Sequence, residues 1–265
     1  MKIMIRLTVF FFMMMVSAHT HAQQWSLGVR GGLSIPNLSA GGSSSSNPLN
    51  TGYKSRLGPD LGVFAECKVS QVFSIQPMIE YSSQGGKKDG LQGFPVGAFA
   101  QEFPQGMAPT YLYANFKSEA KLNYLMIPIL AKFGWDFNAG SPFRFYVDAG
   151  PFVGFNVAAK QVTTGSSNIY LDAAGTQPLP TGTVSFDTTQ DIKSQINTVN
   201  FGLEANAGFT YKFSHSNLFI EGGFNYGFLN IQKGTANGKN NTGAGTVSVG
   251  YQQWFGGGSK KIKKA

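Results

Sequence analysis

The stretch Asn200–Phe213, which reads NFGLEANAGFTYKF, decides the fold of this chain. Its odd-numbered residues are apolar or aromatic, and its even-numbered residues are polar, charged or glycine. Side chains alternate between the two faces of a strand with a period of two, whereas a helix repeats every 3.6 residues. The stretch is therefore expected to be a strand with one apolar face and one polar face.

Seven further segments carry the same alternation, although the fourth strand is apolar on both faces. The eight expected strands cover about 25–34, 59–69, 73–83, 120–135, 143–159, 200–213, 218–229 and 245–255. Short connections near 70–72, 136–142 and 214–217 alternate with long segments at about 35–58, 84–119, 160–198 and 230–244. This order predicts an all-β fold, an eight-stranded antiparallel up-and-down meander.

The N-terminal residues carry the pattern of an export signal. Lys2 and Arg6 precede an apolar core, Leu7–Val16, and Thr20–Ala22 offers a small-residue cleavage site. The ten-residue core is too short to span a bilayer as a helix, so residues 1–22 are expected to be a signal peptide. An uncleaved membrane anchor is the alternative. Residues 23–255 then form the barrel domain, and residues 256–265 form a basic periplasmic tail.

The composition favours a membrane barrel over a soluble sandwich. Charged residues make up 13% of the chain, about half the usual share, while aromatic residues make up 14%. Each strand spans the roughly 9–11 residues that a tilted transmembrane strand needs. Short periplasmic turns and an even strand number place both termini in the periplasm of a Gram-negative cell. The aromatic residues expected to form a girdle near the short turns are Trp25, Phe73, Trp135, Phe143, Tyr211, Phe213, Trp254 and Phe255.

The positive net charge is local and does not indicate a nucleic-acid partner. Of the net charge of +8, two charges lie in the leader and four lie in the last ten residues. The remaining +2 is too small for a basic binding face. Cys67 is the only cysteine, so an intramolecular disulfide is impossible.

Charged residues are also expected on the inward face of the barrel. The lumen of an eight-stranded barrel is narrow enough for side chains to fill it, and buried charges there must be paired. A closed, salt-bridged core is therefore expected, and a narrow channel for ions or small solutes is the alternative. The nine residues of this charge network, four basic and five acidic, are Arg30, Glu66, Lys68, Glu80, Arg144, Asp148, Glu204, Lys212 and Glu221.

Residues that could support catalysis are sparse. His215 is the only histidine after the leader and lies in an expected short turn, so a Ser-His-Asp arrangement at the outer rim lacks its base. No cluster has the spacing of metal ligands, and no cofactor is expected. Glu66 and Glu80 could act as paired carboxylates, but they are expected in the closed core. The sequence thus predicts a non-enzymatic protein, with a lipid- or peptide-acting barrel enzyme as the alternative.

One segment resembles a known family. Leu122–Phe133, LNYLMIPILAKF, is similar to the Y-L-x-I-P-x-L-x-K-[FY] strand of the PorT-like outer-membrane β-barrel proteins of Bacteroidota. Gly28–Ser34 and Gly58–Phe64 resemble that family more weakly, and Met126 stands where the family usually has an acidic residue. The resemblance implies an eight-stranded outer-membrane barrel. Some family members are similar to components of a protein-secretion apparatus. Pro128 cannot donate to the sheet ladder, so a bulge is expected there.

The external loops are where a partner is expected to bind. The segment Phe94–Phe116 is rich in aromatic residues and could cover the barrel mouth, contact lipid or bind a protein; packing on its neighbours is the alternative. The protein is therefore expected to be a monomer in the lipid of the outer membrane, structural or partner-binding. The residues expected to form the loop contact surface are Phe94, Phe99, Phe103, Tyr111, Tyr113 and Phe116.

Overall fold

Eight long antiparallel strands build the computed structural model, which describes residues 24–40, 47–49, 51–234 and 238–255. The expected signal peptide and basic tail lie outside these residues. Among the described residues, no helix has the length and apolar character needed to cross a membrane. The long strands are β1 (Gln24–Ala40), β2 (Gly58–Lys68), β3 (Phe73–Pro95), β4 (Tyr111–Asp136), β5 (Phe143–Thr164), β10 (Val199–Lys212), β11 (Ser216–Gly227) and β12 (Asn240–Phe255).

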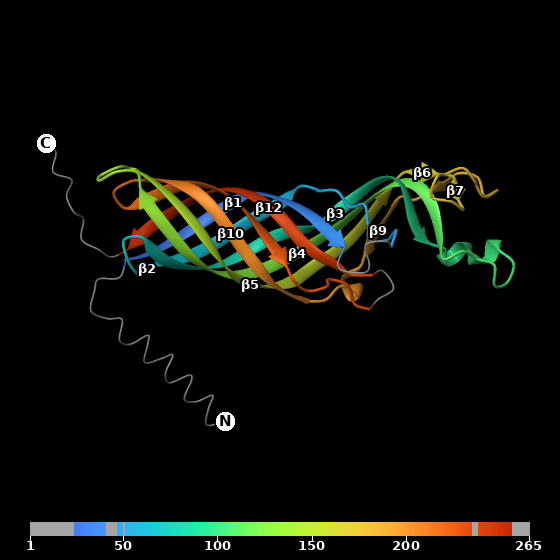
Figure 1. Ribbon diagram of the computed structural model, residues 1–265, viewed down its shortest axis with the longest axis horizontal. Coiled ribbons are helices and arrows are strands. Elements are labelled where there is room, and N and C mark those ends of the chain that lie inside the picture. Colours follow the sequence, from blue (N-terminus) through green and yellow to red (C-terminus); the bar gives the residue numbers. More distant parts are fainter. Residues whose placement is uncertain (1–23, 41–46, 50, 235–237, 256–265) are drawn as a thin grey trace, which may run out of the picture.

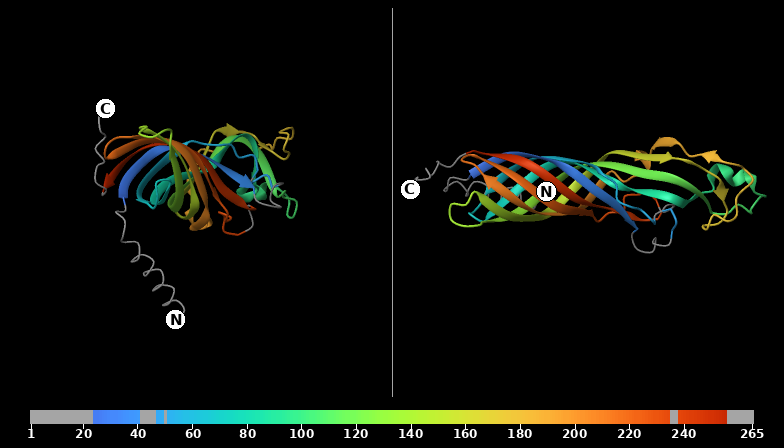
Figure 2. Two further views of the ribbon diagram at one scale, coloured as in Figure 1. Left: turned by 60° about the vertical axis from the view of Figure 1, so that its left-hand side comes forward. Right: turned by 90° about the horizontal axis from the view of Figure 1, so that it is seen from above.

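These strands close into a barrel (Figure 1). Each strand pairs with its neighbours in sequence, and β1 pairs with β12 from Trp25 opposite Phe255 onward. Closure matters because an open edge in hydrocarbon would leave unpaired N–H and C=O groups that cost several kcal/mol each. Two further views show the strands running obliquely around the wall (Figure 2). The expected eight-stranded up-and-down barrel is confirmed.

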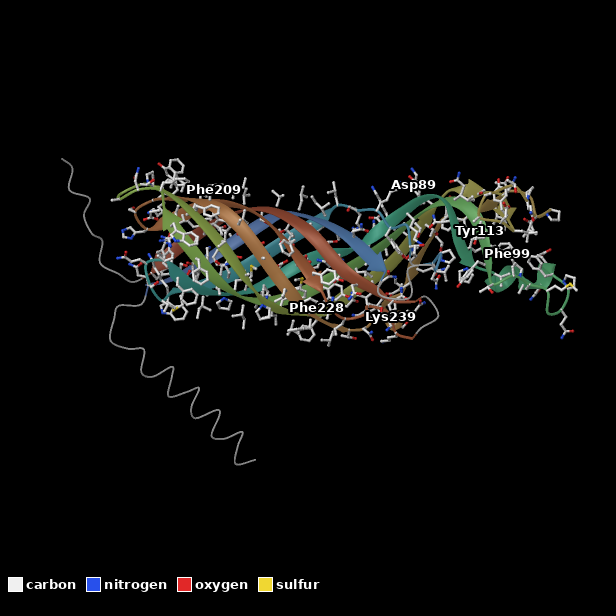
Figure 3. All side chains as sticks on the ribbon, viewed as in Figure 1. Asp89, Phe99, Tyr113, Phe209, Phe228 and Lys239 are labelled. Carbon is white, nitrogen blue, oxygen red and sulfur yellow. The ribbon has the colours of Figure 1, made fainter. Side chains whose placement is uncertain are left out.

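The outer wall is apolar over a belt that matches a bilayer. Along β1 the exposed residues run from Trp25 to Ile35, and every second residue points outward. About ten residues at roughly 3.3 Å each, tilted by about 40°, give a belt of about 25 Å. Phe209 and Phe228 lie on this outer surface in Figure 3.

The aromatic girdle at the short-turn end is formed by all but one of the expected residues. Trp25, Trp135 and Phe143 are about half exposed on the outer wall. Trp254 is the exception, because it pairs with the inward-facing Ser26 and lines the lumen mouth. It lies next to Phe255 in the sequence, and neighbouring residues of a strand face opposite sides.

The inward face is packed by aromatic rings that lie on glycines of the neighbouring strand. A Cβ atom at Gly28 would lie 2.2 Å from the Phe64 ring, and one at Gly250 would lie 2.2 Å from the Phe219 ring. Phe64 and Phe219 are buried and meet edge to face, with their centroids 5.8 Å apart. The absence of side chains at these two glycines therefore lets large rings fill a narrow barrel.

Three strands continue beyond the belt and form what we call the arm. The arm comprises residues 85–121 of β3, β4 and their connection, and residues 160–195. It also includes the short elements η2 (Gly97–Glu102), β6 (Ser166–Ser167), β7 (Ile169–Tyr170), β8 (Val184–Ser185), β9 (Thr188–Asp191) and η3 (Lys193–Gln195). The expected loop 84–119 is thus wrong in large part, since β3 and β4 stay paired out to Pro95 opposite Tyr111.

Pro128 does not cause the expected bulge. It stands opposite Phe152 of β5 in regular register. On the β3 side, no pair is formed between Pro77 opposite Ile129 and Glu80 opposite Met126, so the ladder is interrupted where Pro128 lacks its N–H. The register shift between β4 and β5 lies at Asn123 and Tyr124 instead, near the outer end of the belt.

Candidate functional site

A single guanidinium organises the middle of the lumen. Arg30 donates to Glu80 at 2.6 Å, to Glu221 at 2.8 Å and to Glu204 at 3.0 Å, and Asp60 lies 3.7 Å away. These side chains come from β1, β2, β3, β10 and β11, so one residue ties five strands together. All five side chains are at least 96% buried, and breaking a buried pair of this kind typically costs about 3–5 kcal/mol.

Further hydrogen bonds extend this layer around the lumen. The Tyr146 hydroxyl donates to Glu221 at 2.6 Å, and Ser82 donates to Asp60 at 2.9 Å. Asn206 donates to Asp148 at 2.9 Å and to Glu204 at 3.1 Å. The carboxylates are thus held by neutral donors as well as by Arg30.

A second buried cation, Lys132, lies nearer the short-turn end. Its ammonium lies 3.3 Å from Glu66 and 3.0 Å from the amide oxygen of Gln76, and it sits 4.0 Å above the Tyr146 ring. Lys132 is also directly opposite Asp148 across β4 and β5. Sequence reasoning missed this residue because its strand appeared apolar on both faces. The signal was its even-number spacing from Leu130, Met126 and Tyr124, which are all buried.

The buried middle of the lumen is acidic, which corrects the near-balance expected from the sequence. Lys68, Arg144 and Lys212 are only partly buried and lie at the short-turn mouth. Arg30 and Lys132 alone therefore face six buried carboxylates. One of these carboxylates, Asp60, was not among the nine residues of the expected charge network. The six are Asp60, Glu66, Glu80, Asp148, Glu204 and Glu221.

Large side chains fill the remaining lumen. Tyr124, Tyr146 and Leu130 are at most 2% exposed, and Met126 and Phe152 pack in the outer half of the barrel. Together with the two charged layers they occupy the cross-section along the barrel. The arrangement therefore resembles a solid protein core more than a pore.

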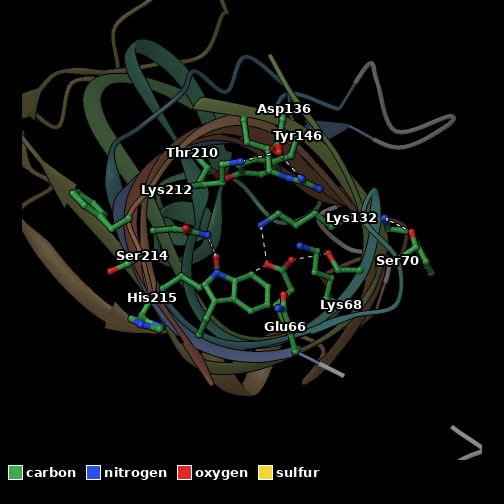
Figure 4. Close-up of a pocket in the computed structure, with 18 residues that line it drawn as sticks. Glu66, Lys68, Ser70, Lys132, Asp136, Tyr146, Thr210, Lys212, Ser214 and His215 are labelled. Atoms are coloured by element: carbon green, nitrogen blue, oxygen red, sulfur yellow. Dashed lines mark hydrogen bonds and ion pairs between the residues drawn. The ribbon is translucent and has the colours of Figure 1, made fainter. Parts of the chain in front are cut away.

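The short-turn mouth holds a polar hollow, which we call the vestibule (Figure 4). Its volume is about 250 Å³. Lys212 and Arg144 both contact Asp136, at 2.8 Å and 3.1 Å. Lys68 lies 5.7 Å from the centre of the Trp254 ring. The vestibule thus collects the three cations that sequence reasoning had assigned to the core.

The aromatic residues of the arm pack mainly on one another. Phe116 is buried and stacks on Phe186 with centroids 4.6 Å apart, and Phe94 meets both rings edge to face. Phe99 contacts Phe94 in the same way. Phe103, Tyr111 and Tyr113 are half-buried. The expected contact residues therefore form much of the interior of the arm, and Figure 3 places Phe99 and Tyr113 within it.

Two cations fasten the base of the arm to the segment that follows β1. Arg56 donates to Glu119 at 2.7 Å and to Ser83 at 2.9 Å. Burial raises the pKa of the Glu119 carboxyl, but the hydrogen bond and charge of Arg56 outweigh it and leave that pKa below its ordinary value. Lys88 donates to the backbone oxygens of Pro48 and Leu49, and burial lowers its pKa to about 8.

The residues that the sequence offered for catalysis lie apart from one another in the described part of the chain. His215 lies in the turn between β10 and β11 at the rim of the vestibule, where its carbonyl accepts hydrogen bonds from Trp254 and Gln253 of β12. Glu66 and Glu80 are buried in separate layers, each bound to its own cation. Within the residues that the structure describes, no group of three His, Cys, Asp or Glu could hold a metal ion.

Comparison with known families gives one match. The model of a family described as an outer membrane protein beta-barrel domain matches residues 21–233, which is most of the chain. No protein of curated function matches in sequence.

Three solved structures of similar shape are distant from this chain in sequence. Neisserial surface protein A is 14% identical with a TM-score of 0.40, covering 86% of this chain and 97% of that one. The attachment invasion locus protein of Yersinia pestis is 11% identical, with a TM-score of 0.36 and the same two coverages. A major outer membrane protein from Thermus thermophilus is 12% identical with a TM-score of 0.41, covering 89% and 100%. None of them carries a role over to this chain.

Proposed function

The chain belongs to the outer membrane protein beta-barrel domain family, and we propose that it is a closed, non-enzymatic barrel whose arm binds a partner outside the membrane. The barrel anchors and orients the arm in the outer membrane. The arm carries the recognition surface.

The arm is the single observation that carries this proposal. All eight strands are needed to close the barrel, but only β3, β4 and β5 continue well beyond the lipid belt. On their outer face the apolar residues of the belt give way to Lys117, Glu119 and Lys121. A paired, clamped projection of this kind costs conformational freedom, and a barrel needs none of it to stay closed. A binding role accounts for a projection that closure of the barrel does not require.

The difference between the short turns at one end of the barrel and the arm at the other supports an orientation in the membrane. Outer-membrane barrels have short periplasmic turns and longer extracellular loops. We therefore place the arm outside the cell and both termini in the periplasm, with residues 1–22 as the export signal. The protein is expected to act as a monomer surrounded by outer-membrane lipid.

One form of the proposal names the class of partner. The segment Leu122–Phe133 resembles a strand of PorT-like proteins of Bacteroidota, some of which are similar to secretion components. A surface protein of a secretion apparatus is therefore the first partner class to test. This assignment rests on resemblance, whereas the binding role of the arm rests on its geometry.

Site-specific photo-crosslinking in cells tests the binding role. Benzoylphenylalanine is placed at Met107, which is 72% exposed in the arm, and at Leu91, which is 39% exposed on β3 of the arm. Ile220 on the outer wall serves as the matched lipid-facing control. We expect a discrete protein adduct from the arm positions alone. Adducts only with lipid, or the same protein adducts from Ile220, would contradict the proposal.

A narrow cation channel is the second candidate, and the acidic lumen favours it. Six buried carboxylates around two cations would attract cations and repel anions. A channel requires a continuous water path through the layer of Tyr146, Leu130 and Phe219, which are buried side chains at the centre. Cation-selective conductance steps that disappear in Glu80→Gln would support the channel over the closed barrel.

A further inference from the structure

The vestibule at the short-turn end carries more positive charge than its carboxylates neutralise. Four cationic side chains, Lys68, Lys132, Arg144 and Lys212, face two carboxylates in the same hollow. These carboxylates, Glu66 and Asp136, leave two positive charges in excess. The short-turn vestibule and the acidic layer around Arg30 therefore have opposite signs within one lumen.

The two carboxylates are already engaged. Asp136 receives Lys212 on one oxygen and Arg144 on the other. Glu66 receives Ser74 at 2.6 Å, Gln252 at 2.7 Å and Lys132 at 3.3 Å. Each oxygen of the two carboxylates therefore already has at least one donor or cation beside it. The excess charge therefore remains on the cationic side chains at the mouth.

Lys68 is the vestibule cation that makes no close ion pair with Glu66 or Asp136 among the described residues. Each close ion pair among the described residues of the vestibule involves Lys132, Arg144 or Lys212, and the Lys68 ammonium lies against the Trp254 ring. Arg144 and Lys212 repel it, while Glu66 and Asp136 attract it without forming a close ion pair. Lys68 lies at the end of β2 and is partly buried at the mouth of the vestibule. The repulsion between like charges that are held close together is reduced when an anion binds between them.

The Arg144 guanidinium is also held in place. A Cβ atom at Gly134 would lie 2.5 Å from its Nε atom, so the glycine makes room for the guanidinium inside the wall. Arg144 also donates to the backbone oxygen of Gln71 at 2.9 Å. A fixed guanidinium beside two ammonium groups is the donor set that proteins use for tetrahedral oxyanions.

We propose that the vestibule is a binding site for a small oxyanion of the phosphate class, held by Lys68, Arg144 and Lys212. These residues come from β2, β5 and β10, so the anion would sit across the mouth. The hollow of about 250 Å³ accommodates a phosphate group but not a large ligand. This site is independent of the arm and of its partner.

Trp254 supplies a direct readout because it lies in the vestibule. In a Trp25→Phe, Trp135→Phe background, Trp254 is the only tryptophan left. Iodide should quench its fluorescence more strongly than neutral acrylamide does, and inorganic phosphate should reduce the iodide quenching in a saturable manner. Equal accessibility to both quenchers, with phosphate acting no differently from chloride at equal ionic strength, would overturn the proposal.

Variants separate a specific site from general positive charge. Lys68→Gln removes an ammonium that makes no close ion pair with either carboxylate, so the substitution should not leave a buried carboxylate unpaired. It should weaken phosphate competition by about tenfold. Lys160→Gln, an exposed cation at the other end of the barrel, should leave competition unchanged. Equal losses in both variants, with heat-modifiable migration of each confirming a folded barrel, would contradict the site.

The phosphate could come from solution or from a lipid headgroup, because the girdle lies at the same level as the vestibule. Nanodiscs of phosphatidylglycerol and of phosphatidylcholine distinguish these sources. If the natural ligand is free phosphate, competition is equal in both lipids. If it is a headgroup, iodide quenching is already reduced in phosphatidylglycerol before phosphate is added. If iodide quenching is not reduced in either lipid and phosphate does not compete in either, both the free-phosphate and the headgroup form of the proposal are contradicted.

Discussion

Strand β4 passes through two environments, and its two halves differ in chemistry although buried and exposed residues alternate in the same way in both. Even-numbered residues are buried along the whole strand, from Leu112 in the arm to Lys132 in the barrel. The odd-numbered face carries Trp135 and Ile129 in the belt but Lys121 and Lys117 in the arm. The change falls near Asn123, where the register of β4 and β5 also shifts.

The pleat of the strand therefore determines which side each residue faces. The surrounding medium, lipid or water, determines which residue types occupy the outer face. In the belt the outer face of β4 meets lipid, and its inner face holds Lys132 together with the buried Tyr124, Met126 and Leu130. In the arm the outer face meets water, and aromatic residues such as Phe116 lie inside. Ion pairs deep in the barrel are accordingly buried, whereas those at the short-turn mouth and in the arm are partly exposed, which sets the expected sizes of the effects below.

The largest effect is expected from Arg30→Met. It leaves four buried carboxylates without their shared cation, and should cost about 3–5 kcal/mol or prevent folding. Urea titration of folding into lipid vesicles, followed by heat-modifiable migration, measures the loss. Adding Glu80→Gln and Glu204→Gln to Arg30→Met should restore part of the stability. No restoration would mean that lost packing, and not unpaired charge, causes the defect.

A smaller loss is expected from Lys132→Met, because Glu66 keeps its hydrogen bonds from Ser74 and Gln252. We expect a loss of about 2–3 kcal/mol. In a double-mutant cycle with Glu66→Gln, the two losses should be strongly non-additive. Additive losses would indicate that the two groups do not interact.

Two glycines of β1 test the packing inside the barrel. Gly28→Ala pushes on the Phe64 ring and should cost about 1–3 kcal/mol. Gly31→Ala points outward, where the nearest atom is 3.4 Å away, and serves as the matched control with little effect. The same urea titration measures both. Equal costs would show that the loss of glycine itself, and not the ring contact, matters.

A pH effect is expected at the base of the arm. The pKa of Glu119 is lower in the folded arm than its ordinary value of 4.5, so the Arg56 clamp is fully present above that value. The clamp is lost as the pH falls through the lowered pKa, since protonation removes the negative charge. Hydrogen exchange of residues 51–57, corrected for intrinsic rates, should rise in acid. Glu119→Gln should remove this pH dependence, and an unchanged acid response in that variant would exclude Glu119 as its source.

The smallest effect on the barrel is expected from shortening the arm. Replacing residues 90–116 with Asn-Gly joins Asp89 to Lys117, which already face each other across β3 and β4. The barrel should keep its heat-modifiable migration, because its pairing lies below this point. Loss of the folded form would show that the arm is part of the folding core and not an appended surface.

The sequence alone predicted the barrel, but it predicted the segments at the two ends of the barrel less well. Period-two alternation predicted eight strands and the inward position of Arg30, Glu80 and Glu204. It missed the arm because a transmembrane strand was expected to need only about ten residues. The alternation did not identify Lys132 as an inward-facing cation, because apolar residues surround it on both faces of β4. The sharing of four carboxylates by one guanidinium depends on distances across the lumen, which no linear pattern encodes.

The central claim is that side chains close the lumen. Single-channel recording of the refolded protein, residues 23–265, in a planar bilayer tests it most directly, with heat-modifiable migration as the control for folding. The closed barrel predicts no steady conductance from protein that migrates as folded. Reproducible, ion-selective steps from the same folded protein would contradict it, and would turn attention from the arm to the acidic layer around Arg30.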